Sequence, residues 1–492
     1  MRHFSRFTLA LFLAVYGLAF ARAAEPVQPI VVGYVFPQNG ALQPGQIDPH
    51  GMTRINYAFA AIRDGRMVLL SEGDKANLRV LTDLKKQNPA LTVLISVGGW
   101  SGSGGFSDAA LTAQSRRVFT DSAIEMVRQC DLDGVDIDWE YPGQPGAGNR
   151  FRPGDKQNFT LLLKELRERL THESAAMHRR LYLTIAAGAD DDYITHTEMA
   201  KVARSVDTVN LMSYDYYEPG SDAKTGNHAP LFTDPADPKK DSADTSVHDF
   251  EAAGVPAAKI VLGVPFYGHV WRQVADVQHG LFQPGKAGPN GYIAYSAIKD
   301  TMLGHGYTRY WDAPSSVPYL YSEDQQVFVS YEDPESLAAK CSYVLSHKLG
   351  GVMFWSYVND AGGELLGAID RGLQGASHGI YRVGGRVLSP TLINAPEPTL
   401  SDEAAKFIKD QHMQRFEFMS LVSVIVDTDG RPKDILLIKE AGHGLDGNAL
   451  EVAAKYRFKP ATFNGNPVPV RVTVAVRFAN FPSASSYGGG EG

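Results

Sequence analysis

Eight short apolar runs recur between residues 30 and 355, and stretches with helical periodicity separate several of them. Most runs are rich in Val, Ile and Leu, which is typical of parallel strands covered on both faces. Strands that alternate with helices favour an α/β fold, here a TIM (β/α)8 barrel. The runs are Ile30 to Tyr34, Arg54 to Ala60, Thr92 to Gly98, Gly134 to Trp139, Tyr182 to Ala187, Thr208 to Met212, Ile260 to Val264 and Gly351 to Trp355.

The clearest helix is expected at Asn158 to Leu170, where apolar residues form one stripe and charged residues the other. In a barrel of this kind, catalytic groups gather at the C-terminal ends of the strands. Polar and aromatic residues follow five of the runs there: Gly98, Gly99, Trp100, Glu140, Tyr214, Asp215, Tyr267 and Trp355.

The fourth run carries three acids at alternate positions, Asp136, Asp138 and Glu140. Alternate residues share one face of a strand, so Val135 and Ile137 lie on the opposite face and can pack against helices. Neighbouring carboxylates that lose hydration repel one another, and this raises the pKa of at least one of them. The row therefore predicts general acid catalysis, with Glu140 nearest the substrate.

Two other interpretations of the acid row are a divalent cation site and a solvated edge strand. The first fits poorly, because a calcium loop places a glycine after its first acids, whereas Gly134 precedes all three acids of the row. The second fits poorly because Trp139 and Tyr141 make full exposure unfavourable.

From residue 25 to residue 374 the chain resembles the family 18 glycoside hydrolases, the chitinase family. DGVDIDWEYP at Asp133 to Pro142 resembles the family signature, and SVGGW at Ser96 to Trp100 resembles a second motif. Three further segments resemble the motifs of the sixth, seventh and eighth strands: LMSYDYY at Leu211 to Tyr217, GVPFYG at Gly263 to Gly268 and GGVMFW at Gly350 to Trp355.

The resemblance implies retaining hydrolysis of β-linked N-acetylglucosamine polymers, with the acetamido group of the substrate as the nucleophile. It assigns acid and base catalysis to Glu140, orientation of the acetamido group to Asp138, and tuning of Asp138 to Asp136. Tyr214 and Asp215 match positions that hold the acetamido group. The alternative for this pair is a polar loop after a strand.

The resemblance assigns the binding of the sugar to residues at the ends of the strands, and it implies no metal and no cofactor. Aromatic rings suit this role because they stack on the C–H faces of sugars. Simple barrel packing is the alternative for Tyr34 and Phe59. The full set is Tyr34, Phe59, Gly99, Trp100, Tyr141, Met212, Tyr267 and Trp355.

The sequence departs from the pattern of the family at two positions. His269 stands where many relatives have arginine, so we expect an altered contact to a neighbouring sugar. Ser356 replaces a glutamate that often follows the tryptophan of the eighth strand. Because Glu140 is present, the lectin-like relatives that lack this acid are a poorer comparison.

About eighty residues separate the last two apolar runs, far more than an ordinary connection needs. We expect an inserted subdomain at about residues 273 to 340, which resembles the α+β insertion of deep-cleft chitinases through Tyr292 to Asp300 and Val327 to Asp333. By analogy, this wall favours processive or chain-end cleavage.

Residues 1 to 23 match an export signal, because Arg2 and Arg6 precede an apolar stretch that ends in a small-x-small pattern at Ala21 to Ala23. The stretch is shorter than the ~20 residues of a spanning helix, so we expect an exported periplasmic or secreted protein with no transmembrane span after cleavage. We expect no disulfide between Cys130 and Cys341.

After a linker at residues 375 to 386, residues 387 to 480 resemble the C-terminal domain of TonB-type energy transducers. The resemblance rests on Val422 to Ile435, Leu445 to Ala461 and Asn464 to Phe478. The expected order is strand, turn, strand, helix and a last strand with alternating valines. Two alternatives remain for the role of this domain: a docking module for an envelope protein, or a stabilising appendage. Residues 481 to 492 are expected to be a disordered tail.

The chain has a formal net charge of −8, which argues against nucleic acid as a partner but not against a neutral polymer such as chitin. Three functions remain: a chitinase-like hydrolase, a hydrolase of another N-acetylglucosamine glycan such as a peptidoglycan fragment or an N-glycan core, and a non-catalytic chitin-binding protein. Glu140 argues against the third.

Overall fold

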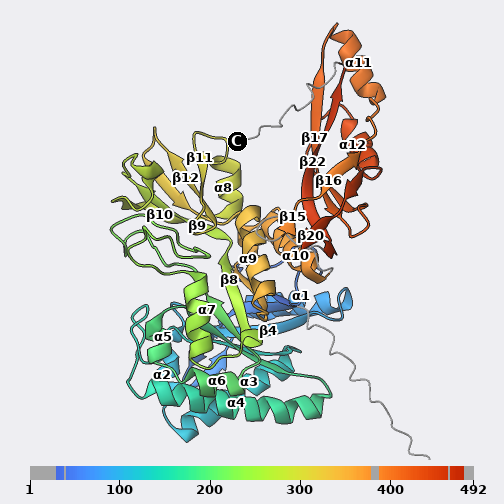
Figure 1. The fold of residues 1–492 in the computed structure, drawn as a ribbon. Coiled ribbons are helices and arrows are strands. Elements are labelled where there is room, and N and C mark those ends of the chain that lie inside the picture. Colours follow the sequence, from blue (N-terminus) through green and yellow to red (C-terminus); the bar gives the residue numbers. More distant parts are fainter. Residues whose placement is uncertain (1–28, 38–39, 378–386, 464–465, 481–492) are drawn as a thin grey trace, which may run out of the picture.

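The computed structural model describes residues 29–37, 40–377, 387–463 and 466–480 (Figure 1). Within them, eight parallel strands close into a barrel, because β1 pairs with both β14 and β2. The predicted fold class is therefore confirmed. The strands are β1 (Ile30–Val35), β2 (Arg54–Arg63), β4 (Thr92–Gly98), β5 (Gly134–Asp138), β6 (Tyr182–Gly188), β7 (Thr208–Met212), β8 (Ile260–Pro265) and β14 (Gly351–Trp355).

Helices cover the outside of the barrel, as Figure 1 shows. The expected helix at Asn158 to Leu170 lies within α4 (Asp155–Met177), whose Leu162, Leu166 and Leu170 are buried. The other helices of this part are α1 (Glu72–Asp83), α2 (Phe106–Ala109), α3 (Ala113–Gln129), α5 (Asp191–Thr195), α6 (Met199–Ser205), α7 (Ala243–Ala252), α9 (Pro334–Ser346) and α10 (Glu364–Ser377).

In strand β5, the packing of the apolar face determines the direction in which the acids of the other face point. Val135 and Ile137 are fully buried in the main core. Trp139 follows them and is 1% exposed, with its ring stacked on Phe106 at 5.2 Å and edge-on to Phe159 at 5.6 Å. Because neighbouring side chains alternate, this anchoring turns Asp136 and Asp138 toward the interior of the barrel.

The inserted subdomain is an antiparallel sheet of five strands in the order β10-β9-β13-β12-β11. Its first strand begins at Tyr267, two residues after β8 ends, and its last strand ends at Ser330, before α9 returns to the barrel. The elements are β9 (Tyr267–Arg272), β10 (Lys286–Ala294), α8 (Tyr295–Thr301), β11 (Thr308–Asp312), β12 (Val317–Ser322) and β13 (Val327–Ser330). A short strand, β3 (Arg66–Val68), extends β2 as a hairpin.

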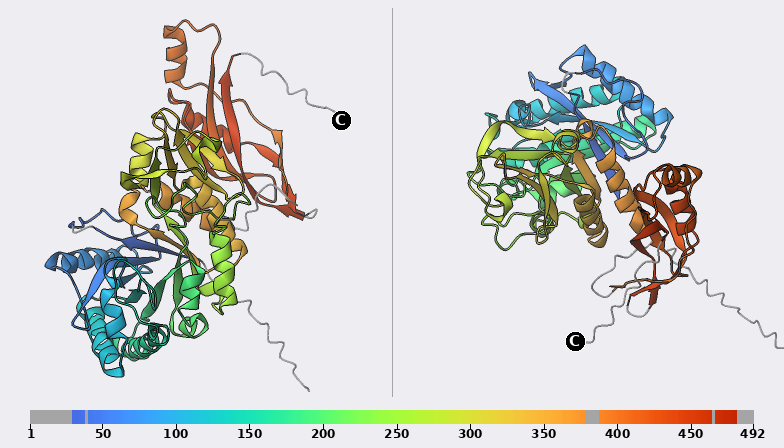
Figure 2. Two further views of the ribbon diagram at one scale, coloured as in Figure 1. Left: turned by 90° about the vertical axis from the view of Figure 1, so that its left-hand side faces the viewer. Right: turned by 90° about the horizontal axis from the view of Figure 1, so that it is seen from above.

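The C-terminal region, red in Figure 2, has a hydrophobic core of its own. A sheet in the order β18-β17-β22 is covered by α12 (Leu445–Ala453), which reproduces the expected order of strands and helix. These strands are β17 (Glu417–Val426), β18 (Pro432–Lys439) and β22 (Val470–Ala479). The sequence did not predict α11 (Asp402–Asp410) or the short strands β15 (Val387–Leu388), β16 (Thr391–Asn394), β19 (Arg457–Lys459), β20 (Ala461–Phe463) and β21 (Asn466–Val468).

Several predictions concern segments near or beyond the described residues. The expected export signal and the expected tail lie outside the described residues, as do residues 378–386 of the expected linker. Residues 375–377 of that linker belong to α10. Cys130 and Cys341 are not joined by a disulfide. Among the described helices, none combines the length and the apolar character needed to cross a membrane.

Candidate active site

Asp136 lies at the base of the acid row and is fully buried inside the barrel. Its carboxylate accepts hydrogen bonds from the hydroxyls of Tyr34 at 2.9 Å and Ser96 at 2.8 Å, and from Thr184. Asn210 donates a longer one at 3.3 Å. Burial raises the pKa of Asp136, and the hydroxyl donors oppose this shift. The donors come from β1, β4, β6 and β7, so the closed barrel itself builds this pocket.

Asp138 and Glu140 continue the row toward the open end of the barrel. Asp138 is 4% exposed, and its Oδ1 atom has no hydrogen-bond partner among the described residues. Burial, with the charges of Glu140 and Asp136, raises the pKa of Asp138 well above its usual value. Burial also raises the pKa of Glu140 to about 7, assisted by the charge of Asp215 and opposed by hydrogen bonds from Tyr141 and Asp138. Glu140 is therefore about half protonated at neutral pH.

The SVGGW segment packs closely against the end of β5. Gly98 has a φ of +112°, and a Cβ atom there would lie 2.1 Å from the carbonyl oxygen of Asp138, so only glycine fits. Ser103, in the loop that follows, accepts a hydrogen bond from the Glu140 N–H at 2.9 Å and donates to the Asp138 carbonyl at 3.0 Å. This loop fixes the backbone from which the Glu140 side chain extends.

Tyr214 and Asp215 follow β7, and their surroundings hold them in opposite protonation states. Burial and the charge of Asp215 raise the pKa of Tyr214 well above its usual value, so its hydroxyl stays neutral. Burial opposes ionisation of Asp215, but the hydrogen bond with His269 and the nearby His228 ring outweigh it and hold the pKa of Asp215 below its usual value. Asp215 has a φ of +63°, in the left-handed region, which costs a non-glycine residue about 1–2 kcal/mol.

Three side chains surround the Asp215 carboxylate. The Tyr267 hydroxyl lies 2.7 and 2.8 Å from its two oxygens, and His269 Nε2 lies 2.8 Å from Oδ1. His228 Nδ1 is 3.5 Å from the same oxygen. Burial lowers the pKa of His228 to about 4, whereas the hydrogen bond to Asp215 raises the pKa of His269 despite burial. The contact with Asp215 therefore favours the protonated form of His269.

An aromatic cluster forms the floor of the site around Trp355. Its ring stacks on Phe59 at 5.5 Å and on Phe36 at 5.6 Å, and it lies 5.8 Å from Tyr34. The register between β2 and β4 shifts between Ala58 and Ala60, so a bulge places Phe59 out of the regular alternation. A Cβ atom on Gly99 would lie 2.7 Å from the Phe59 ring, so a glycine there leaves room for this ring.

The other predicted binding residues lie at different depths. Tyr34 and Tyr267 are 2% and 3% exposed, so they lie beneath the surface of the site, whereas Trp100 is 57% exposed. Tyr141 and Met212 are partly buried, and the Tyr141 ring packs edge-on to Trp100 at 6.4 Å. Direct contact of any of these residues with a sugar stays a prediction.

Sequence reasoning missed most of the residues that support the acids. Ser96, Thr184 and Asn210 lie in strands and have interior-facing side chains, which alternation alone predicts. His228 lies in the loop between β7 and α7, and no pattern in the sequence marks it. Asp215, His228 and His269 each offer one metal-ligating atom, and these atoms lie within 4.8 Å of one another.

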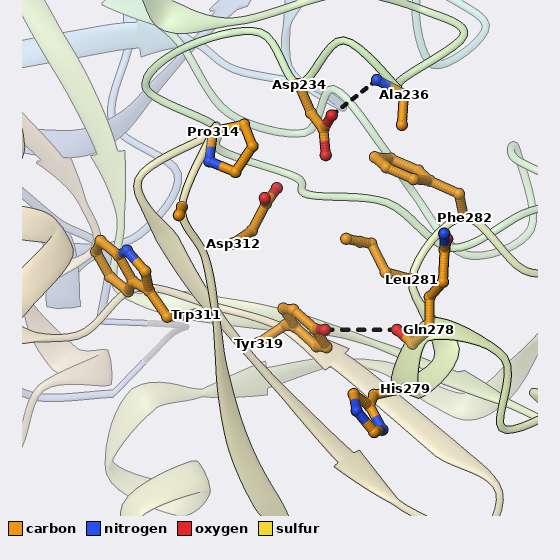
Figure 3. Close-up of a pocket in the computed structure, with 11 residues that line it drawn as sticks. Asp234, Ala236, Gln278, His279, Leu281, Phe282, Trp311, Asp312, Pro314 and Tyr319 are labelled. Carbon is orange, nitrogen blue, oxygen red and sulfur yellow. Dashed lines mark hydrogen bonds between the residues drawn. The ribbon is translucent and has the colours of Figure 1, made fainter.

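A separate hollow of about 410 Å³ lies in the inserted subdomain and its neighbouring loop (Figure 3). Trp311, Tyr319 and Phe282 line it together with Asp234 and Asp312. None of the predicted site residues lines this hollow. We therefore assign the active site to the end of the barrel, where the residues with shifted pKa values lie, and not to this hollow.

Known proteins resemble the two parts of the chain separately. The model of the glycosyl hydrolases family 18 matches residues 30–360, and the model of the Gram-negative bacterial TonB protein C-terminal matches residues 419–479. Chitinase A1 of Niallia circulans is 43% identical over 300 residues, which are 58% of this chain and 43% of that protein. The chain thus spans less than half the length of Chitinase A1.

Two further relatives are covered over most of their length. Chitotriosidase-1 of Mus musculus is 31% identical over 328 residues, which are 63% of this chain and 68% of that protein. A solved family 18 N-acetylglucosaminidase from Paenibacillus barengoltzii is 42% identical with a TM-score of 0.63, covering 70% of this chain and 99% of that one. Together with the closed barrel and the acid row of β5, these matches show that the chain belongs to glycosyl hydrolase family 18, with a TonB C-terminal-like domain fused behind the barrel.

Proposed function

We propose that the protein hydrolyses β-1,4-linked N-acetylglucosamine polymers, chitin or chito-oligosaccharides, by a substrate-assisted retaining mechanism. The observation that carries this proposal is the acid row, in which Glu140 has a pKa of about 7 and Asp138 offers an unpartnered oxygen among the described residues. A general acid needs a proton near neutral pH, and an acetamido N–H needs an acceptor.

Glu140 acts first as the acid that protonates the glycosidic oxygen. The acetamido oxygen of the substrate attacks the anomeric carbon, the bond to the leaving sugar breaks, and an oxazolinium ion forms. Glu140, now ionised, removes a proton from the incoming water, which opens the oxazolinium ring and restores the starting acid.

Asp138 orients the acetamido group through its free Oδ1 atom and balances the positive charge of the oxazolinium ion. Asp136, held by three hydroxyls, tunes Asp138 from below, because its charge raises the pKa of Asp138. Tyr214, whose neutral hydroxyl can donate to the acetamido oxygen, and ionised Asp215, which accepts hydrogen bonds, hold the acetamido group in position for attack. Trp355 supplies the apolar floor on which the sugar ring stacks.

The pH dependence of the reaction should report the pKa of Glu140. The first step needs the protonated acid, and its pKa is about 7, so kcat/KM should fall about tenfold per pH unit above that value. Initial rates with a soluble chito-oligosaccharide between pH 4 and pH 9 measure this. A rate that stays constant through pH 9 would contradict the assignment of Glu140.

Trp100 should matter more for long substrates than for short ones, because its exposed ring lies beside Tyr141 at the rim of the site. Trp100→Ala should raise KM for chitohexaose by about 2–10-fold, the effect of losing one stacking contact. Phe232→Ala removes another exposed ring, which packs on Tyr343, and serves as the matched control. Equal effects of both substitutions would argue against a role of Trp100.

A test of the function itself is the set of products released from colloidal chitin and from chito-oligosaccharides of two to six sugars. The N-acetylglucosaminidase relative favours a second candidate, chain-end release of single N-acetylglucosamine units. Mainly disaccharide products would support a chitinase, and mainly monosaccharide products would support the second candidate. Binding without any cleavage would indicate a non-catalytic role and overturn both.

We further propose that the protein is exported to the periplasm or secreted, and that the C-terminal domain docks to an envelope protein. The proposal is supported by the signal-like N-terminus and by the match to a TonB C-terminal family model. The separate hydrophobic core of residues 404–478 supports a domain that folds by itself. If residues 387–480 retained no envelope protein in a pull-down, this result would contradict docking and favour a stabilising appendage.

A further inference from the structure

Three side chains beside the acid row form a cluster that the hydrolytic reaction explains only in part. Asp215 is the acetamido-positioning group of the proposed function, and His228 and His269 lie behind it and lower its pKa. His228 is fully buried, and neither of its ring nitrogens has a hydrogen-bond partner among the described residues. A buried imidazole without a partner is costly unless another group satisfies it.

The backbone fixes His228 so that its ring points at Asp215. Its N–H donates to Ser330 Oγ of β13 at 2.9 Å, and its carbonyl accepts from the Tyr216 N–H at 3.1 Å. The ring lies 4.8 Å from the His269 ring, measured between centroids, and Nδ1 lies 3.5 Å from Asp215 Oδ1. The orientation is therefore set by two separate elements of the fold.

His269 is oriented in the way that metal-binding histidines usually are. Its Nδ1 lies 3.3 Å from the carbonyl oxygen of Gly291, to which it can donate, and its Nε2 faces the Asp215 carboxylate. A hydrogen bond from one ring nitrogen to a backbone carbonyl orients the ring, and a metal ion would replace the hydrogen bond between Nε2 and Asp215. Tyr267 donates to both Asp215 oxygens and would orient the third ligand in the same manner.

We propose that Asp215, His228 and His269 form a binding site for a divalent transition-metal ion such as Zn²⁺, and that an ion bound there blocks the reaction. The donor atoms lie within 4.8 Å of one another; bonds of about 2.0–2.2 Å to zinc require the widest separation to shrink and the 2.8 Å contact between His269 and Asp215 to open. Two imidazoles and one carboxylate suit Zn²⁺ and its neighbours, whereas Mg²⁺ and Ca²⁺ prefer oxygen ligands alone. No other group of three such residues is found in the described part of the chain.

An ion can reach the cluster from the open end of the barrel. The Asp215 side chain is 35% exposed, whereas the side chains of His228 and His269 are 0% and 8% exposed. Metal coordination would occupy the carboxylate that must contact the acetamido group, so bound zinc and bound substrate should exclude each other. This inhibitory half of the inference rests on the proposed function, while the binding half does not.

Titration calorimetry of the full chain with Zn²⁺, after dialysis against a chelator, tests the binding half. We expect one ion per chain, and we expect His228→Gln and His269→Arg each to weaken binding by at least about 100-fold. His269→Arg places a cation beside Asp215 but removes the ligand. His279→Gln is the matched control, because it removes an exposed histidine 3.4 Å from the carboxylate of Asp276.

The visible spectrum of Co²⁺ in the same chains gives a second measurement, since tetrahedral coordination by histidine produces a strong band. Equal thermal unfolding midpoints for parent and variants exclude misfolding as the reason for lost binding. Binding that is equal in all four chains, or no binding at 0.1 mM Zn²⁺, would overturn the inference.

Hydrolysis of a chito-oligosaccharide tests the inhibitory half. The metal-free parent should lose at least about tenfold activity at ten times the zinc dissociation constant, and a chelator should restore it. Site-specific binding that leaves the rate unchanged would overturn the inhibitory half. Zinc binding by a metal-free chain that cannot cleave the substrate would support the site and contradict the proposed function instead.

Discussion

Glu140→Gln should lower kcat on chito-oligosaccharides by about 10²–10⁴-fold, the contribution expected of one general acid. The amide keeps the size of the side chain but cannot give up a proton to the glycosidic oxygen. The backbone N–H of residue 140 still reaches Ser103 at 2.9 Å, so the fold should be unchanged. Initial rates under saturating substrate measure the effect.

Glu125→Gln is the matched control for this substitution. Glu125 lies on α3, its side chain is 54% exposed, and it pairs with Arg66 on the outside of the barrel. Its replacement should leave kcat within a factor of two. If Glu140→Gln kept more than a tenth of the parent activity, Glu140 would not be the acid of the reaction.

Asp138→Asn should lower kcat by about 10²–10³-fold with little change in KM, because stabilisation of charge in the transition state contributes to kcat. The amide has the same shape, but it cannot carry the negative charge that balances the oxazolinium ion. A hydrogen bond from Asp138 also lowers the pKa of Glu140, so its replacement should shift the alkaline limb of the pH profile.

Asp108→Asn provides the corresponding control on the surface of the barrel, where Asp108 pairs with Arg150 and Arg152. It should change neither kcat nor the pH profile. A rise in KM with unchanged kcat for Asp138→Asn would assign Asp138 to ground-state binding and would contradict the role proposed here.

The barrel could be predicted from the sequence because its signal is local. Thr92 to Gly98, Thr208 to Met212 and Gly351 to Trp355 are strands with the bounds that the apolar runs predict. The start of the insertion was less visible, because β9 begins at Tyr267, only two residues after β8 ends, with no separating loop. In the C-terminal region, the alternating valines of β22 predict a strand whose inner face packs on α12.

The supporting residues of the site could not be predicted, because they meet only when the barrel closes. Asp136 and Asn210 are 74 positions apart, and His228 reaches Asp215 through a loop whose path the sequence does not reveal. His269 stood out as a departure from the family, but its partner was not foreseen. The structure adds that partner: the Asp215 carboxylate, 2.8 Å away.

The most direct test of the account is the anomeric form of fresh products, followed by proton NMR within the first minute of chitotetraose hydrolysis. A substrate-assisted retaining mechanism predicts that the new reducing ends appear as the β-anomer and only later equilibrate. New reducing ends that appear first as the α-anomer would show inversion and would contradict the mechanism derived from Glu140 and Asp138.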